Sequence, residues 1–227
     1  MFIEIRNRYN NEAMIRGEYK DLKDAVEKNK YNLRNADLSY AHLFNVDCLH
    51  GDLENADLRG AKLRGADFRN VHANGCNLQG ADCRDANFDG VDLLAANMRG
   101  GIFREVVFGD AEMRGCDCQG ADFYEADLSG AILRGANLCG CDMTRCNLKS
   151  TNLLGANLRD ANIEGCSFNE FTNVKRTILE GVKNLSQGIP KEYIHNAPDS
   201  GVIKPDTKKE MENKKEAIDN KRQGKRN

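Results

Sequence analysis

Ala56-Asp57-Leu58-Arg59-Gly60 is followed directly by Ala61-Lys62-Leu63-Arg64-Gly65 and then by Ala66-Asp67-Phe68-Arg69-Asn70. Each five-residue unit has a large apolar residue at its centre, a small residue two positions earlier and a polar residue between the two. The phase holds without a slip for 28 consecutive units, whose centres run from Leu33 to Phe168. This period decides the fold.

A period of five fits neither a helix nor a flat strand. Successive centres would spread all round a helix, and they would alternate between the two faces of a strand. A chain that turns by a quarter every five residues points every centre inward, and four units then close one coil. Stacked ~4.8 Å apart like parallel strands, about seven coils would form a rod of roughly 34 Å. Phe68, Phe88 and Phe108 recur four units apart, so we expect an aromatic column.

The units follow the motif A-[DN]-L-x-x, and residues 31–170 resemble the pentapeptide repeat family. The resemblance implies an all-β fold, a right-handed four-sided parallel β-helix. Members of this family differ widely in function, so the resemblance implies little about activity. The segments Ile15–Tyr19 and Leu22–Val26 also resemble the leader of many bacterial and phage members, which suggests such a context.

Both ends of the rod need a cap, because an open coil exposes unpaired strand edges. At the start, Phe2–Tyr9 and Met14–Tyr19 predict a hairpin, and Asp21–Lys28 predicts a short helix with Asp21 as N-cap. We therefore divide the chain into an N-terminal cap (1–31), the coil (32–170), a C-terminal cap (171–196) and a flexible charged tail (197–227). The residues that break the phase and would cover the second end are Phe171, Ile178, Leu179, Val182 and Leu185.

The nine cysteines first suggest redox or metal chemistry. The N-terminus lacks the apolar stretch of a signal peptide, so we expect a cytoplasmic protein without a disulfide framework. Eight cysteines fall at inward positions, where free cysteine replaces Ala or Leu. Two alternatives are disfavoured. Zinc binding by Cys116-x-Cys118 and Cys139-x-Cys141 lacks the usual spacing, and a Cys146–Cys166 disulfide would need an oxidising compartment.

No pattern in the sequence predicts catalysis. Glycines five apart imitate a phosphate loop, but no Lys-Ser/Thr follows them, and the H-E-x-x-H and G-x-S-x-G motifs are absent. The recurring Asp and Asn residues suit turns, and the glycine-rich calcium signature of β-rolls is missing. We expect a non-enzymatic protein with no catalytic residue, no cofactor and no metal.

Binding would have to use the outward positions. Arg64, Arg84 and Arg104 should stack in a row that Tyr124 continues, with Asp82, Asp122 and Asp142 beside it. This row is either an ordinary solvated salt-bridge ladder or a partner-binding stripe. At Ile102 and Val107 the usual Asp or Asn is lost, and these two residues are a candidate interface on neighbouring sides of the rod.

These features favour a scaffold or protein-interaction rod of unknown partner, with self-association as one option. The alternative, implied by the family resemblance, is a DNA mimic that modulates a type II topoisomerase such as gyrase. Residues 33–170 hold 21 Asp+Glu against 13 Lys+Arg. Because DNA of ~34 Å carries ~20 charges without interleaved cations, this balance disfavours mimicry. We expect no membrane contact, and only weak nucleic-acid binding by the tail, where residues 204–227 hold nine Lys+Arg and five Asp+Glu.

Overall fold

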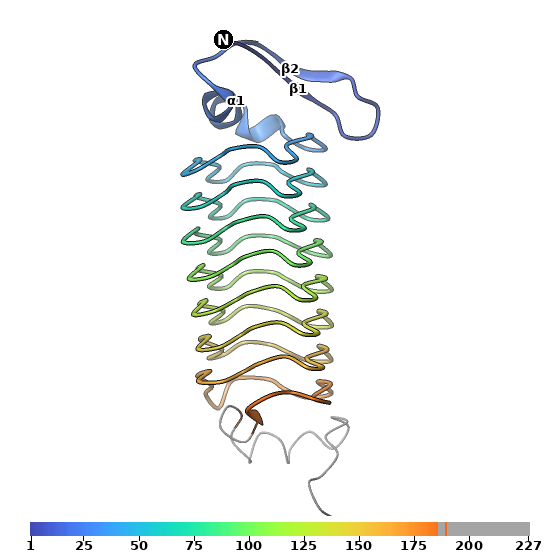
Figure 1. Cartoon of the computed structure of the whole chain (residues 1–227), viewed down its shortest axis with the longest axis vertical. Coiled ribbons are helices and arrows are strands. Elements are labelled where there is room, and N and C mark those ends of the chain that lie inside the picture. The colour runs from blue at the N-terminus through green and yellow to red at the C-terminus, as the bar shows by residue number, and fades with distance from the viewer. Residues whose placement is uncertain (186–188, 190–227) are drawn as a thin grey trace, which may run out of the picture.

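The repeat winds into a rod of stacked coils in the computed structural model, which describes residues 1–185 and 189 (Figure 1). Parallel bridges join residues that lie four units apart. They begin with Asp37↔Asp57 and recur at every fifth residue as far as Asn147↔Ser167. This is the pairing that the period of five predicts, so four units make one coil and each unit forms one side.

We name the four sides after one central residue each, in chain order: the Leu58 side, the Phe103 side, the Phe88 side and the Leu93 side. Each name covers every fourth unit, so that the centres of one side stack in a single column. The central residues and the small residues two positions earlier are buried along nearly the whole rod. The core is therefore a narrow filled column, and chemistry is left to the outer surface.

Two sets of hydrogen bonds hold each unit. The N–H of a central residue donates to a carbonyl in the next coil, as in Leu58 N to Asn77 O at 2.8 Å. The N–H three residues after a centre donates back to that centre, as in Ala61 N to Leu58 O at 3.0 Å. The second bond closes a corner at which Gly60 has a φ of 62°. Glycine adopts this conformation without steric cost, which explains its recurrence two positions after the centres.

The predicted aromatic column is confirmed. Phe68 and Phe88 stack with ring centroids 4.8 Å apart and planes at 7°, and Phe88 lies 5.2 Å from Phe108. A second stack, Phe103 on Phe123 at 5.3 Å, contacts Phe108 from both rings. The five rings form one continuous aromatic core under two sides of the rod.

A hairpin closes the N-terminal end, at the top of Figure 1. Strands β1 (Phe2–Arg6) and β2 (Ala13–Glu18) pair antiparallel, with Ile5 opposite Ile15. Both isoleucines are buried against the core. The carbonyl of Arg6 accepts a hydrogen bond of 2.7 Å from the N–H of Asp37, which joins the hairpin to the first coil.

A short helix, α1 (Leu22–Lys28), follows the hairpin. The carboxylate of Asp21 accepts a hydrogen bond of 2.8 Å from the N–H of Asp24 and so caps the helix. Ala25 and Val26 are fully buried, and the 3₁₀ turn η1 (Lys30–Asn32) leads into the coil.

At the other end the parallel ladder does not stop at residue 170, where the regular phase of five ends. Parallel pairing continues beyond it, with an offset one residue larger than before, through Asn152↔Asn173, Asn157↔Ile178 and Asn162↔Lys183. One extra residue near Phe171 shifts the phase, much as a bulge does, without ending the ladder. Leu179 is buried as a central residue, whereas Phe171 and Ile178, predicted to cover the end, are exposed. Val182 and Leu185 are partly buried against the core. Residues 186–188 and 190–196 of the predicted cap, and the predicted tail, lie outside the described residues.

The corner glycines give a test of this geometry. A Cβ at Gly130 (φ 72°) would collide with Asp110 Oδ1, whereas a Cβ at Gly135 (φ 67°) would meet nothing within 4 Å. We expect Gly135→Ala to lower the free energy of unfolding by ~1–2 kcal/mol from backbone strain alone, and Gly130→Ala to lower it by more. Denaturant unfolding measures both. Equal losses of unfolding free energy in the two variants would contradict the collision. So would a failure of Asp110→Ala, added to Gly130→Ala, to recover the extra loss.

Candidate functional site

Each predicted arginine of the Phe103 side has an acidic partner. Arg84 binds Asp82 in a bidentate pair, with Nε–Oδ1 at 2.8 Å and Nη2–Oδ2 at 2.7 Å. Arg64 pairs with Asp85 at 2.9 Å, and Arg104 with Asp122 at 2.5 Å. The hydrogen bond from Arg84 holds the pKa of the nearly buried Asp82 below its usual range. The row is therefore an internally neutralised ladder rather than a free cationic stripe.

Tyr124 continues the row, as predicted, and lies between two guanidinium groups. Its ring centroid is 5.6 Å from the Arg104 guanidinium carbon and 5.9 Å from that of Arg145. Arg145 Nη1 also donates to the Tyr124 hydroxyl at 3.1 Å and pairs with Glu125 at 2.8 Å. Tyr124 is thus held in place by its neighbours.

Ile102 and Val107 lie on adjacent sides, in columns that Asp and Asn dominate. Ile102 pairs with Asp82 and Asp122 on the Phe103 side and is half-buried. Val107, on the Phe88 side, pairs with Asn87 and Asp127 and keeps 37% of its surface exposed. The two residues therefore differ: Ile102 sits among ion pairs, and Val107 is the more open of the two.

The carboxylates around Val107 form no ion pairs in the described chain, and Arg69 acts on Asp89 only at longer range. Within residues 1–185 and 189, no ion pair involves Asp89, Glu105, Asp110 or Asp127. From this part of the chain, the Asp127 carboxylate accepts hydrogen bonds from Ser129 N and Asn147 Nδ2, both at 2.9 Å. The Phe88 side as a whole carries six of the 21 acidic residues of the repeat but only two of its 13 basic residues, Arg69 and Lys149. Sequence reasoning missed this concentration, although sorting the charges by side would have found it.

Eight of the nine cysteines are buried thiols with a structural role. Cys116, Cys141, Cys146 and Cys166 each donate from Sγ to a carbonyl in the preceding coil at 2.9 Å. Burial raises the pKa of the Cys48 and Cys141 thiols to about 12. All nine cysteines are free, Cys146 and Cys166 included. In the described part of the chain, no group of three or more His, Cys, Asp or Glu residues is placed to hold a metal.

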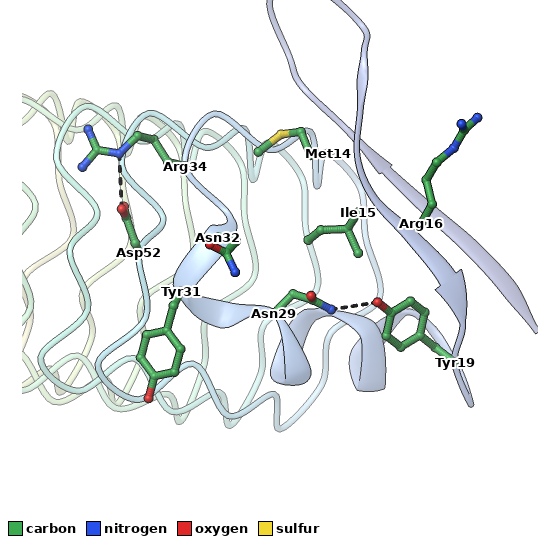
Figure 2. A pocket seen from close by; sticks show the side chains of 9 residues that line it. All are labelled: Met14, Ile15, Arg16, Tyr19, Asn29, Tyr31, Asn32, Arg34 and Asp52. Atoms are coloured by element: carbon green, nitrogen blue, oxygen red, sulfur yellow. Dashed lines mark hydrogen bonds and ion pairs between the residues drawn. The ribbon is translucent and has the colours of Figure 1, made fainter.

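Open clefts indent the surface formed by the described residues, and two of them lie at different places on the rod. The first, of about 620 Å³, lies between the hairpin and the first coil (Figure 2). Met14 and Ile15 point into this junction, and Arg16 points away from it. Four polar residues of the cleft pair with one another: Asn29 Nδ2 donates to the Tyr19 hydroxyl at 3.0 Å, and Arg34 pairs with Asp52 at 3.2 Å.

The second cleft, of about 610 Å³, runs along the corner between the Phe88 and Leu93 sides. It brings His50 and His72 to one groove, which the sequence analysis did not foresee, and His72 Nδ1 lies 3.8 Å from Asp92 Oδ2. The other lining residues are Asn70, Val71, Gly90, Val91 and Glu112. None of them is a serine, threonine or cysteine, so the groove contains no nucleophile for a His–acid pair to activate.

Taken together, these features define a solenoid of five-residue units with a packed core and an ion-paired surface. The family model for pentapeptide repeats matches in 8 copies, over residues 32–70, 66–104, 94–130, 102–140 and 131–170. The chain belongs to the pentapeptide repeat family, whose fold is the right-handed four-sided β-helix. Among residues 1–185 and 189, none of the helices has the length and hydrophobicity needed to cross a membrane.

Several solved structures are similar. HetL, a pentapeptide repeat protein involved in heterocyst differentiation regulation in the cyanobacterium Nostoc sp. strain PCC 7120, is 28% identical, with coverage of 66% of this chain and 70% of that one and a TM-score of 0.29. Trypsin-treated QnrB1, a plasmid-mediated fluoroquinolone resistance protein, is 24% identical over 60% and 78%, with a TM-score of 0.36. A pentapeptide repeat protein from the thylakoid lumen of Arabidopsis thaliana is 28% identical over 66% and 77%, with a TM-score of 0.22. No curated protein matches the chain.

Thiol reactivity should follow burial. Cys139 is the one cysteine that the structure leaves partly exposed, and the other eight are buried. We expect an aromatic disulfide reagent at pH 8 to label one thiol per native chain and nine after denaturation, because only an accessible thiolate reacts. A Cys139→Ser control should label none in the native state. Fast labelling of several native thiols would contradict the packed interior.

Alkaline pH should destabilise the fold through the same thiols. The pKa of Cys141 is about 12 when folded against an ordinary value of 9.0, so the folded chain keeps a proton that the unfolded chain loses. This contribution is fully present below pH 9 and is lost as the pH rises towards 12. As the pH rises from 9 towards 12, we expect the unfolding free energy of the Cys141→Ala variant to fall less steeply than that of the unchanged protein, by ~1 kcal/mol per pH unit.

Thr151→Ala is the matched control. Thr151 occupies the same inward position and donates from its hydroxyl to Leu128 O at 2.8 Å, but it does not titrate. The loss of unfolding free energy caused by Thr151→Ala should be constant across the pH range. A pH dependence equal to that of Cys141→Ala would count against the thiol as the cause.

Proposed function

We propose that the protein is a non-enzymatic scaffold, an interaction rod of about seven regular coils, that acts in the cytoplasm through the surface around Val107. The family supports this coarse class, because pentapeptide repeat proteins are generally structural or interaction proteins. In the proposed organisation, residues 1–31 cap the first coil and the residues after the last coil close the second end. The function then belongs to the sides of the rod.

The observation that carries the proposal is an exposed apolar side chain, Val107, placed beside carboxylates that form no ion pair in the described chain. Val107 exposes an apolar side chain in a column of Asp and Asn, and the carboxylates around it form no ion pair within the described chain. An apolar contact rimmed by unmatched charge is what a protein interface offers. A partner segment with one apolar side chain and several Lys or Arg residues fits this surface.

The arginine row has a secondary part in this proposal. Arg64, Arg84 and Arg104 already satisfy acidic residues of the same chain. A partner that used them would have to displace those pairs, which are worth little individually at an exposed surface. We propose that Ile102 and Tyr124 extend the Val107 surface at its edge, while the three arginines determine where along the rod a partner binds.

Charging the surface should test this assignment. We expect Val107→Glu and Ile102→Lys to leave the circular dichroism spectrum unchanged and to reduce partner capture, or self-association in sedimentation, at least tenfold. Leu94→Glu is the matched control, because Leu94 is 42% exposed on the Leu93 side. Equal binding by all three variants would refute the assignment to Val107, and equal loss would point to a nonspecific effect of charge.

A second candidate is DNA mimicry towards a type II topoisomerase. Its support is the acidic row on the Phe88 side, where Asp47, Asp67, Asp89, Asp110 and Asp127 follow one another along the rod. Two of these, Asp47 and Asp67, are neutralised by Lys30 and Arg69, so the row is far sparser than the phosphates of DNA. A gyrase supercoiling assay tests it, since mimicry requires inhibition or protection that is lost in an Asp89→Lys, Asp127→Lys variant.

A further inference from the structure

The Phe88 side is unlike the adjoining Phe103 side in how its charges are matched. On the Phe103 side, Asp82 and Asp122 each bind an arginine of the same side. On the Phe88 side, Asp89, Asp110 and Asp127 have no such partner among the described residues, and Val107 is exposed between them. Gly109 adds no side chain beside Val107, and the Asp89 carboxylate lies across it, since a Cβ there would be 2.6 Å from Asp89 Oδ1.

The chain itself contains a segment of the opposite character. Residues 204–227 hold nine Lys+Arg against five Asp+Glu, and they include the apolar residues Met211 and Ile218. Their excess of four positive charges is opposite in sign to the charge of the Phe88 side, where six acidic residues are matched only by Arg69, Lys149 and, from the N-terminal cap, Lys30. We propose that this C-terminal segment binds in cis along the Phe88 side, with its lysines and arginines on Asp89, Asp110 and Asp127 and an apolar residue on Val107.

The geometry of the rod permits the contact. Ile189 is buried at the C-terminal end and donates to Leu185 O at 3.3 Å, which places the start of the remaining chain. Val107 lies three bridge steps from Ser167, through Asp127 and Asn147, a height of roughly 14 Å. The residues between 190 and 204 can span up to ~50 Å. The chain after Ile189 is therefore long enough for the basic segment to reach Val107.

A segment tethered this closely acts as a competitor for the surface. Its effective concentration lies in the millimolar range, so a cationic partner must displace it before binding. This consequence rests on the proposed function, whereas the contact itself does not. A crosslinking experiment on the full-length chain distinguishes the competition from the contact, because it detects the contact directly.

The test places a photo-crosslinking p-benzoylphenylalanine at position 107, with Ser129, one coil further along the same side, as a second probe position. Gln119, exposed on the opposite Leu58 side at the same height, is the matched control position. We expect irradiation in 50 mM NaCl to give crosslinks from position 107 to residues 204–227 within monomers, at least fivefold more than from position 119. The yield should fall at least fivefold in 500 mM NaCl, where charge attraction is screened, and in an Asp89→Asn, Asp110→Asn background.

Equal yields from both positions, no crosslink to residues 204–227 from either probe, or crosslinks confined to a dimer band would each overturn binding in cis. The last outcome would assign the surface to a second copy of the chain. If Val107→Glu abolishes partner capture while the crosslinks are absent, the proposed function stands and this inference fails. If the crosslinks form but no partner depends on Val107, the inference stands alone.

Discussion

The structure depends above all on one hydrogen bond, from the N–H of each centre to the carbonyl just before the centre stacked on it in the next coil. Phe88 N to Val107 O, at 2.7 Å, is one instance. A single coil buries too little apolar surface to hold its shape, so each coil is stable only against its neighbours. Since this bond repeats at every unit, it fixes the stacking of every side chain, inside and outside the rod.

Inside, strict stacking explains the choice of residues. Rings placed one coil apart meet at the distance that offset stacking prefers, as Phe68 and Phe88 do. The small inward positions adjoin corner carbonyls, and a thiol or hydroxyl there supplies a second hydrogen bond to that carbonyl, as Cys146 does to Phe123 O at 2.9 Å. The unusual number of cysteines thus follows from packing and corner chemistry rather than from redox chemistry.

The sequence was sufficient to predict what depends on the period alone. The coil of four units, the Phe68–Phe88–Phe108 column and the neighbourhood of Arg84 and Asp82 all follow from counting. Which acid each arginine binds does not, because Arg84 turns back to Asp82 in its own unit while Arg104 reaches Asp122 in the next coil. That choice depends on side-chain rotamers, which no period encodes.

The C-terminal end shows a second limit of counting. A single extra residue near Phe171 destroys the five-residue phase, yet the ladder resumes at Asn173. Recognising the repeat in the sequence requires an unbroken five-residue phase. The parallel ladder requires only that an N–H and a carbonyl of adjacent coils lie opposite each other. The groove that holds His50 and His72 was missed for a related reason: it lies across a corner, where positions that differ in the repeat become neighbours.

Stacking also brings charged side chains of adjacent coils close together. Columns place like residues ~4.8 Å apart, well within the Debye length of ~8–10 Å at ordinary salt, so carboxylates in adjacent coils repel unless a cation lies between them. The Phe103 side interleaves arginines and removes much of this repulsion. Asp89, Asp110 and Asp127 stand at three different positions of their units, so they do not stack on one another, and no ion pair within residues 1–185 and 189 involves them. The ladder that builds the rod therefore also decides which side matches its charges internally and which side we propose binds a cationic segment.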